Sequence, residues 1–269
     1  MGTISIKINA LKTIHRPQNV NALTHPPSPT FKFAPRHPIS PLQTQALQGT
    51  EQIMNDHPFT FAGADLSFRA TGALFWPAER LLVVSDLHLG RSERFARRAG
   101  ALLPPYEVQD TLTRLETDID ATGATTVICL GDSFDDDAAA HGLDDSVALW
   151  ITRLMAGRRW VWIEGNHDPG PVELGGDHRA DLILGPLTFR HIAAPGAVGE
   201  VSGHYHPKAR VAGRARPCLL RDDARVILPA YGTYTGGLRS HDRALTTLMQ
   251  PGAVAVLTGT RPLAIPMPR

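Results

Sequence analysis

Three apolar runs, each followed by a polar cluster, constrain the fold of this chain more than any other feature. The runs are residues 81–84, 125–130 and 160–163, and most of their side chains are Leu, Val, Ile or Trp. Continuous runs of this length are typical of strands that are buried on both faces. Apolar residues at steps of three and four predict helices between them: Val108, Leu112, Leu115 and Ile119, then Val147, Trp150, Ile151 and Leu154. The alternation of strands and helices predicts a layered α/β domain.

Short strands are predicted on both sides of these runs. Gly and Pro punctuate brief apolar segments that are too short for helices. The segments are residues 59–61, 66–68 and 74–76 before the first run, and residues 182–184, 187–189 and 226–228 after the helical patterns fade. We expect the later strands to form a second sheet that packs beside the first within one domain.

The first 53 residues differ in composition from the rest of the chain. They contain seven prolines and carry a charge of +4, with Glu51 as their only acid. Proline lacks the backbone N–H and fixes φ, so such a segment builds neither helix nor central strand. We interpret residues 1–55 as a disordered N-terminal extension or as the result of a misassigned start before Met54, and residues 56–269 as the folded domain. A transit peptide is a weaker alternative, because the segment is neither Arg-rich nor amphipathic.

The composition excludes several classes of protein. No stretch approaches the 18 or more apolar residues that span a bilayer, so we expect no membrane segment. Cys129 and Cys218 are far apart in sequence, which excludes a disulfide framework and indicates a cytoplasmic protein. Residues 54–269 carry a net charge of −3, so any contact with nucleic acid must be local.

Polar clusters follow each of the three buried runs. Because the carboxyl ends of parallel strands meet at one edge of a sheet, these clusters should lie together. A fourth cluster follows the run 198–201. The clusters are residues 85–88 (SDLH), 131–135 (GDSFD), 165–168 (GNHD) and 203–206 (GHYH). At the two-residue period of a strand, Asp86 and His88 would face the same way, as would His204 and His206.

These clusters have the chemistry of a metal site. The candidate ligands are Asp86, His88, Asp132, Asn166, His191, His204 and His206. Carboxylate, imidazole and amide oxygen together suit Mn, Fe or Zn. Seven ligands exceed what one ion takes, and they suit two ions bridged by a carboxylate, an arrangement that polarises a phosphate. Any one of these residues alone is more commonly a helix cap or a structural histidine, but the agreement of spacing and placement makes that explanation improbable for the set.

The series DLH, GDSFD, GNHD, a lone His and GHYH resembles the signature of the calcineurin-like metallophosphoesterases, in the same order. The resemblance implies two packed mixed β-sheets flanked by helices. It also implies that Asp86, His88 and His206 bind one ion, that Asn166, His191 and His204 bind the other, and that Asp132 bridges them. By the same resemblance, His167 contacts the phosphate and protonates the leaving group, and Asp168 orients His167.

Five longer stretches resemble the ligase-associated DNA damage response endonucleases of bacteria: residues 85–98, 100–106, 129–136, 203–208 and 228–237. This resemblance implies a phosphodiesterase that cuts DNA in repair, with a DNA ligase and a helicase as associated proteins. It implies two divalent metal ions, of which Mn is the first expectation and Fe, Zn, Co or Mg are alternatives.

Four basic residues near the predicted ligands are candidates for contact with substrate phosphates: Arg91, Arg94, Lys208 and Arg210. A guanidinium forks onto phosphate oxygens, so arginine suits this role. Arg91 and Arg94 lie on one face if their segment, which also contains Arg97 and Arg98, is helical. The alternative is an ordinary solvated helix face.

Two other functions stay open. A phosphodiesterase or pyrophosphatase that acts on a small nucleotide or metabolite would use the same metal site. A catalytically idle, metal-stabilised module that binds a DNA repair partner is an alternative of another class, and His167 argues against it because a structural site has no need of an unligated histidine. The sequence contains neither a GxSxG motif nor a GK[ST] phosphate loop.

Overall fold

The computed structural model describes residues 56–92, 94, 106–136, 139, 142–168, 170 and 174–269. The interpretation of residues 1–55 as an extension or misassigned start falls outside this part of the chain. The strands are β1 (Asp56–Phe61), β2 (Ala64–Arg69), β3 (Leu74–Trp76), β4 (Leu81–Val84), β5 (Thr126–Leu130), β6 (Arg159–Ile163), β7 (Asp177–Arg179), β8 (Asp181–Leu184), β9 (Leu187–Arg190), β10 (Glu200–Ser202), β11 (Lys208–Val211), β12 (Arg214–Arg221), β13 (Arg225–Ile227), β14 (Val254–Leu257) and β15 (Leu263–Pro266). The helices are η1 (Pro77–Glu79), α3 (Glu107–Thr122), α5 (Asp145–Met155) and α6 (Arg243–Leu248).

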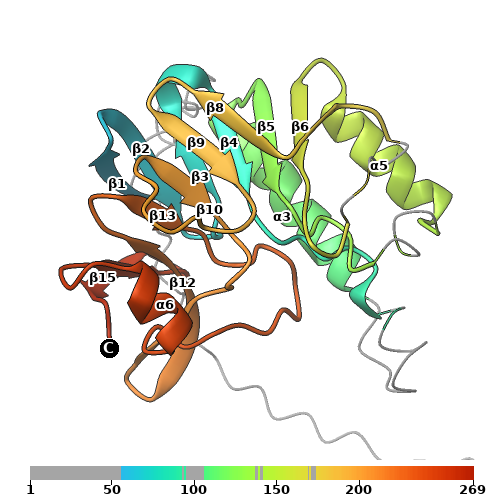
Figure 1. Ribbon diagram of the computed structural model, residues 1–269. Coiled ribbons are helices and arrows are strands. Elements are labelled where there is room, and N and C mark those ends of the chain that lie inside the picture. Colours follow the sequence, from blue (N-terminus) through green and yellow to red (C-terminus); the bar gives the residue numbers. More distant parts are fainter. Residues whose placement is uncertain are drawn as a thin grey trace, which may run out of the picture. The chain divides into compact units, whose positions relative to one another are not determined.

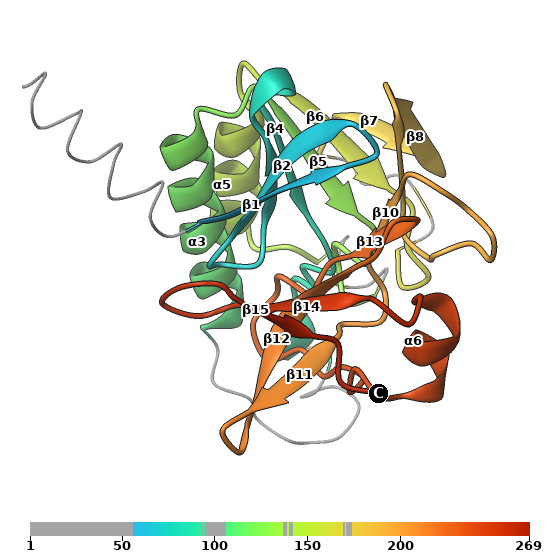
Figure 2. The same ribbon diagram turned by 90° about the vertical axis from the view of Figure 1, so that its left-hand side faces the viewer.

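The first sheet brings the ends of the three predicted buried strands to one edge. Its order is β1-β2-β3-β4-β5-β6-β7, with antiparallel pairing from β1 to β4 and parallel pairing from β4 to β7. Two helices connect the parallel strands and cover one face of this sheet (Figures 1 and 2). The carboxylate of Asp144 caps the start of α5 by accepting a hydrogen bond from the Ser146 N–H, and α3 ends at Gly123 in a left-handed conformation.

The second sheet has the order β15-β14-β12-β13-β10-β9-β8, and β11 pairs with β12 beside this path. Strand β10 is parallel to both of its neighbours, whereas the remaining pairs are antiparallel. Both sheets are therefore mixed, as the sequence resemblance implied. In the described residues, no helix is long and apolar enough to cross a membrane.

The two-residue period of the central strands explains the layers. In β4, Leu81 and Val83 face the core between the sheets, while Leu82 and Val84 face the core under α3 and α5. β5 and β6 alternate in the same way, so all three strands are buried on both faces. A third core lies between the second sheet and α6. The predicted fold class, a layered α/β domain with two packed sheets, is confirmed.

Two local features differ from the prediction. The fourth polar cluster follows a run placed at residues 198–201, but the strand there, β10, starts only at Glu200, and the side chain of Val198 is exposed. Helix α6 was not predicted, because its six residues are too few for a helical period to stand out. Its start is nevertheless encoded locally, since the carboxylate of Asp242 accepts a hydrogen bond from the Ala244 N–H.

One buried carboxylate ties α3 to both sheets. Asp118 accepts hydrogen bonds from Arg69 Nε at 2.8 Å, from the Thr71 hydroxyl at 2.6 Å and from the Tyr231 hydroxyl at 2.9 Å. Asp118 and Tyr231 are both fully buried. The segment after Tyr231 packs on the loop that carries the first predicted ligands, because the Gly232 N–H donates to the Asp86 carbonyl. Asp118 therefore stabilises, through Tyr231 and Gly232, the loop that carries Asp86.

We predict that Asp118→Ala lowers the free energy of unfolding by about 3 kcal/mol, because it leaves the Arg69 guanidinium partly buried with one carboxylate partner fewer. Tyr231→Phe removes a single hydrogen bond to the same carboxylate and should cost about 1 kcal/mol. Urea unfolding of the metal-free protein measures both values. Equal costs for the two variants would contradict the central role of Asp118.

Candidate metal centre

The loops that follow β4 and β5 run side by side and carry three of the predicted ligands. The His88 N–H donates to the Asp132 carbonyl at 2.9 Å, which extends the parallel pairing beyond the strands. Asp86, His88 and Asp132 all have positive φ, between 47° and 53°. The assumption that Asp86 and His88 continue an extended strand is therefore wrong, although both lie in one group of side chains, as a common direction requires. The left-handed residues turn the backbone, and strain of this kind is typical of functional sites.

His204 and His206 also have positive φ, at 70° and 46°, and the prediction that they face the same way is wrong too. His206 contacts Asp86, whereas His204 contacts His191. The preceding Gly203 is required, because a Cβ at this position would collide with the Ser85 hydroxyl. The two histidines thus belong to two neighbouring groups of side chains.

The first group consists of Asp86, His88 and His206. His206 Nε2 lies 3.1 Å from Asp86 Oδ1 and 3.3 Å from His88 Nε2. Burial alone would raise the pKa of Asp86, but its contacts with His206, His191 and the Ser85 hydroxyl hold this pKa below its usual value. A buried carboxylate that stays ionised between two imidazoles is a typical cation ligand.

The second group consists of Asp132, His191 and His204, with Asn166 beside it. His191 Nε2 lies 3.4 Å from Asp132 Oδ2, 3.2 Å from His204 Nδ1 and 3.0 Å from Asn166 Oδ1. Despite burial, the contacts with His191 and the His167 N–H hold the pKa of Asp132 well below its usual value. Burial and the charge of His191 lower the pKa of His204, which keeps its imidazole neutral and able to bind a metal.

These donors fit a divalent metal ion. His191 Nδ1 lies 2.8 Å from the Leu130 carbonyl, which can only accept, so Nδ1 carries a hydrogen and Nε2 faces the Asp132 carboxylate and the Asn166 oxygen. Burial would lower the pKa of His191, but the hydrogen bond to Asp132 and the charges of Asp86 and Asp132 raise it, so without a metal ion a proton on Nε2 takes the place of the cation. Acceptors that converge in a buried site repel one another unless a cation lies among them. The structure brings all seven predicted ligands together in the two neighbouring groups.

Asp135 was not predicted, yet it organises one side of the site. Its buried carboxylate lies 2.9 Å from His88 Nδ1 and accepts hydrogen bonds from Arg91 at 2.9 Å and Arg94 at 3.0 Å. Burial opposes ionisation, but these three partners lower the pKa of Asp135 to about 2. A carboxylate on one nitrogen of a ligating histidine orients the other nitrogen toward the metal. The feature of the sequence that could have identified Asp135 is its position three residues after Asp132.

His167 lies beside the first group, as expected of a residue that acts on the substrate. Its Nδ1 is 2.8 Å from the Asp135 carbonyl and 3.3 Å from Arg94 Nη1. Its ring meets the His88 ring edge-on, with centroids 5.3 Å apart. The Asp135 carbonyl therefore fixes the ring through Nδ1–H, and Nε2 lies 4.0 Å from Asp132 Oδ2.

The expectation that Asp168 orients His167 does not match its contacts. Asp168 Oδ2 accepts hydrogen bonds from the N–H groups of Ser133 at 2.7 Å and Phe134 at 3.1 Å. Burial is the main cause that raises the pKa of Asp168 to about 6. Asp168 thus holds the loop that carries Asp132. Gly165 allows this close packing, since a Cβ there would collide with the Asp132 backbone.

The four predicted phosphate contacts fall into two pairs. Arg91 and Arg94 are bound to Asp135 and keep about a fifth of their side chains exposed, so they do not form a solvated helix face. Arg97 and Arg98 lie outside the described residues. Lys208 donates from Nζ to the Thr235 carbonyl at 2.9 Å, and Arg210 is exposed on the edge strand β11.

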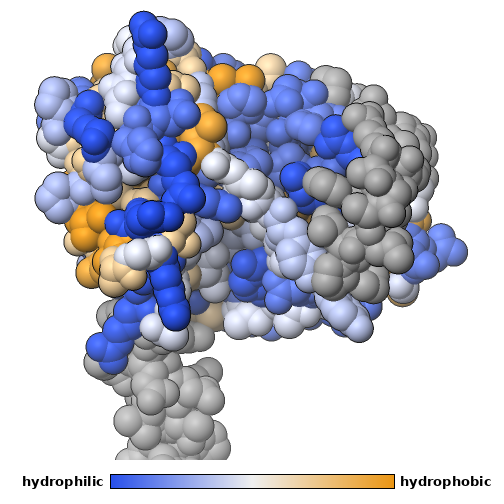
Figure 3. All heavy atoms as spheres, turned by 90° about the horizontal axis from the view of Figure 1, so that it is seen from below, coloured by the Kyte–Doolittle hydropathy of each residue, from blue (hydrophilic) through white to orange (hydrophobic). Residues whose placement is uncertain are grey.

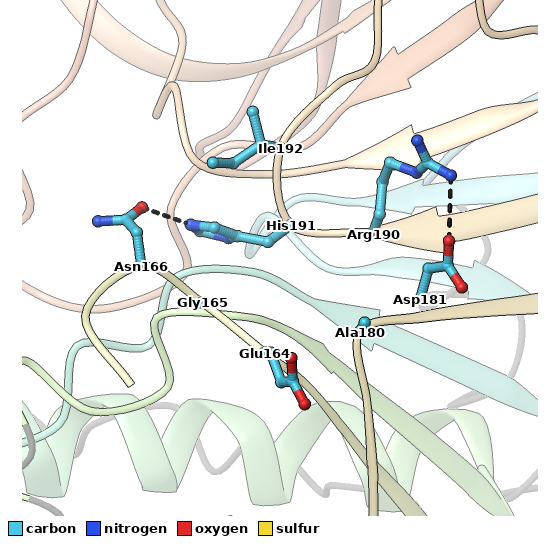
Figure 4. A pocket seen from close by; sticks show the side chains of 8 residues that line it. All are labelled: Glu164, Gly165, Asn166, Ala180, Asp181, Arg190, His191 and Ile192. Atoms are coloured by element: carbon cyan, nitrogen blue, oxygen red, sulfur yellow. Dashed lines mark hydrogen bonds and ion pairs between the residues drawn. The ribbon is translucent and has the colours of Figure 1, made fainter. Parts of the chain in front are cut away.

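An open pocket of about 380 Å³ adjoins the second group of ligands. Figure 4 shows Asn166 and His191 at one end and Arg190 with Asp181 at the other. The lining residues are Glu164, Gly165, Asn166, Ala180, Asp181, Arg190, His191 and Ile192. Of these, Gly165, Asn166 and His191 belong to the motifs found in the sequence, whereas the other five carry no motif.

Comparison with known proteins identifies a family and a similar solved structure. The model of the calcineurin-like phosphoesterase family matches residues 79–246, a range that contains every predicted ligand. The crystal structure of the nuclease MPE from Pseudomonas putida is similar, with a TM-score of 0.63 and 29% sequence identity. The alignment covers 78% of this chain and 100% of that one. None of the curated proteins matches in sequence.

We predict that Asp135→Asn weakens binding of Mn²⁺ by about 10- to 100-fold, because the amide no longer supplies the charge that orients His88. Calorimetric titration of the chelator-treated protein measures the Kd. The matched control is Asp120→Asn, which removes the same charge from an exposed position on α3. Equal Kd values for Asp135→Asn and the control would show that Asp135 does not support the metal site.

Proposed function

Because this chain belongs to the calcineurin-like phosphoesterase family, it is a metal-dependent phosphoesterase, and we propose that it is a dinuclear phosphodiesterase that cuts DNA. Three groups of acids and histidines in the described residues could hold a metal ion, and the dinuclear proposal rests on the two that contain the predicted ligands; the third consists of His88, Asp135 and His167. His191 connects the two groups of predicted ligands, since its ring nitrogens lie 3.4 Å from Asp132 and 3.9 Å from Asp86. One ion could not satisfy both groups and Asn166 together.

The two ions would be held by residues that the structure already brings together. Asp86, His88 and His206 would bind one ion, Asn166, His191 and His204 the other, and Asp132 would bridge them. Bound there, divalent ions supply Lewis-acid stabilisation of the charge that develops on the phosphate. The mixture of carboxylate, imidazole and amide oxygen favours Mn²⁺ among the candidate metals.

His167 would supply the proton that the leaving group needs. The Asp135 carbonyl accepts from Nδ1, so Nε2 is the nitrogen that gains and gives up the exchangeable proton. Arg94 Nη1 lies 3.3 Å from the same nitrogen and packs against the ring, but because Nδ1 donates to the carbonyl it accepts no hydrogen bond from Arg94. The ring is thereby kept in one orientation, which a general acid requires.

Arg91 and Arg94 would bind non-bridging oxygens of the phosphate. Both guanidinium groups bind the Asp135 carboxylate, and Arg94 Nε also lies 3.8 Å from Asp136 Oδ2. A guanidinium presents its N–H donors in a fork that matches phosphate oxygens. Arg94 Nη1 lies 3.3 Å from the His167 ring, so a phosphate on which His167 acts would lie within reach of this guanidinium.

The nucleic-acid substrate is supported by a solved structure and by a local run of charge. The similar protein from P. putida is a nuclease. From Val201 to Arg221 this chain has five Lys or Arg residues and no acid, although residues 54–269 carry a net charge of −3. Part of this run forms the β11–β12 hairpin at the lower end of Figure 1. The view from below shows strongly hydrophilic side chains over this face (Figure 3).

The hairpin starts two residues after the ligand His206, so it would track the DNA backbone away from the cleaved bond. Arg210 is exposed, and within the described chain no acidic side chain pairs with it. Unpaired cations beside a phosphate site bind nucleic acid without regard to sequence. On the sequence resemblance, we place this activity in DNA repair, with a DNA ligase and a helicase as partners.

We predict that His167→Ala lowers kcat for DNA cleavage by about 10²- to 10⁴-fold, the range of a general acid, and leaves the Mn²⁺ content unchanged. Plasmid or oligonucleotide cleavage and elemental analysis of the same samples test both statements. Loss of metal in this variant would show that His167 is a ligand and not a proton donor.

We predict that Arg210→Gln weakens binding of single-stranded DNA equally for all sequences and reduces the slope of log K against log salt by about 0.7. Binding is measured in chelator, so that no cleavage occurs. Arg153→Gln, which removes the same charge from an exposed position on α5, should leave the slope unchanged. An unchanged slope for Arg210→Gln would exclude the hairpin from the DNA-binding surface.

A further inference from the structure

The pocket beside Asn166 and His191 has no role in the chemistry described so far. It lies between the end of β6, the junction of β7 and β8, and the end of β9 (Figure 4). Its volume of about 380 Å³ falls in the range of pockets that bind small molecules, about 300 to 1,000 Å³. Because two ligands of the metal centre line it, a group held there would be attached to the phosphate under attack.

The side on which the pocket opens decides which part of a diester it would hold. His167, the proposed proton donor, lies with His88 and Asp135, so the leaving group departs on that side. The pocket instead opens beside Asn166 and His191, in the second group of ligands. The group in the pocket is therefore the one that stays esterified to the phosphate.

The charges in the pocket exclude a second phosphate. Arg190 is already bound, with Nη2 3.1 Å from Asp181 and Nε 3.7 Å from the buried carboxylate of Glu200. Glu164 is exposed to the pocket, and in the described part of the chain its carboxylate has no hydrogen bond or ion pair. With Glu164, Asp181 and Arg190 the pocket carries a net charge of −1. A neutral group that donates hydrogen bonds suits it best.

We propose, on the basis of the proposed function, that this pocket binds the nucleoside that remains on the phosphate and that Glu164 accepts hydrogen bonds from its base. A carboxylate has two acceptor oxygens, and guanine presents two adjacent N–H donors, N1–H and N2–H, on one edge. Thymine presents a single N–H flanked by two carbonyl oxygens that a carboxylate repels. Ile192, which is 45% exposed, offers an apolar surface to the base. Guanine is therefore preferred to thymine at this position.

The test uses three substrates with the same leaving group: the p-nitrophenyl esters of deoxyguanosine 5′-phosphate and thymidine 5′-phosphate, and methyl p-nitrophenyl phosphate. In each reaction water adds its oxygen to phosphorus and the bond to nitrophenolate breaks, so only the retained group differs. For the wild-type protein with Mn²⁺, kcat/KM should rank guanosine ester above thymidine ester. Glu164→Gln should lower the ratio of guanosine ester to methyl ester by about three- to ten-fold, the effect of one or two hydrogen bonds.

The matched control is Glu79→Gln. Glu79 is an exposed glutamate in η1, just before the start of β4, whereas the predicted ligands follow the end of this strand. This variant should keep the wild-type ratio. An unchanged ratio in Glu164→Gln, or the same change in the control, would overturn the proposal. If the wild-type protein hydrolyses none of the esters and leaves DNA intact, the proposed function fails instead.

A binding measurement tests the pocket without catalysis. Saturation-transfer NMR with deoxyguanosine and the chelator-treated protein should show contact with the base, and the signal should fall in Glu164→Gln but not in Glu79→Gln. Thymidine should give a weaker signal. Equal signals for the two nucleosides in all three proteins would overturn the assignment of Glu164.

Discussion

The site is organised by a shortage of positive charge around two buried aspartates. Within the described residues, neither Asp86 nor Asp132 pairs with a lysine or arginine, and their ionic partners are histidines. The nearest arginines bind Asp135 instead. The left-handed loops, the closely packed glycines and the Leu130 carbonyl that fixes the His191 tautomer all serve to hold acceptors together where a cation is needed. The fold thus leaves negative charge on two buried carboxylates that bound metal ions would neutralise.

Two further carboxylates keep this arrangement in place. Asp135 lies behind His88 and joins it to Arg91, Arg94 and, through its carbonyl, to His167. Asp168 accepts hydrogen bonds from the backbone that follows Asp132. Parallel pairing of β4, β5 and β6 brings these loops to one edge of the sheet, so the chemistry depends directly on strand order. His167, the proposed proton donor, and Arg94, a proposed phosphate contact, both contact Asp135, and none of the three lines the open pocket.

The sequence could bring the candidate ligands together because strands buried on both faces are recognisable as apolar runs, and the candidate residues follow the ends of such strands. Prediction from the sequence failed where tertiary contacts determine the backbone conformation or the partner of a side chain. The backbone at Asp86 and His88 is left-handed rather than extended, and Asp168 bonds to a neighbouring loop rather than to His167. Asp135 was not predicted because its contact with His88 and the arginines exists only in the folded protein. Glu164 has no motif at all, and only the position of β6 beside β7 places it in the pocket.

Native mass spectrometry of the chelator-treated protein, titrated with Mn²⁺, tests the central claim most directly. The account predicts that two ions bind to each chain and that Asp132→Asn, which changes the shared carboxylate, no longer retains both. Binding of a single ion to the wild-type protein, or full retention of two ions in Asp132→Asn, would contradict a centre built from two groups that share one aspartate.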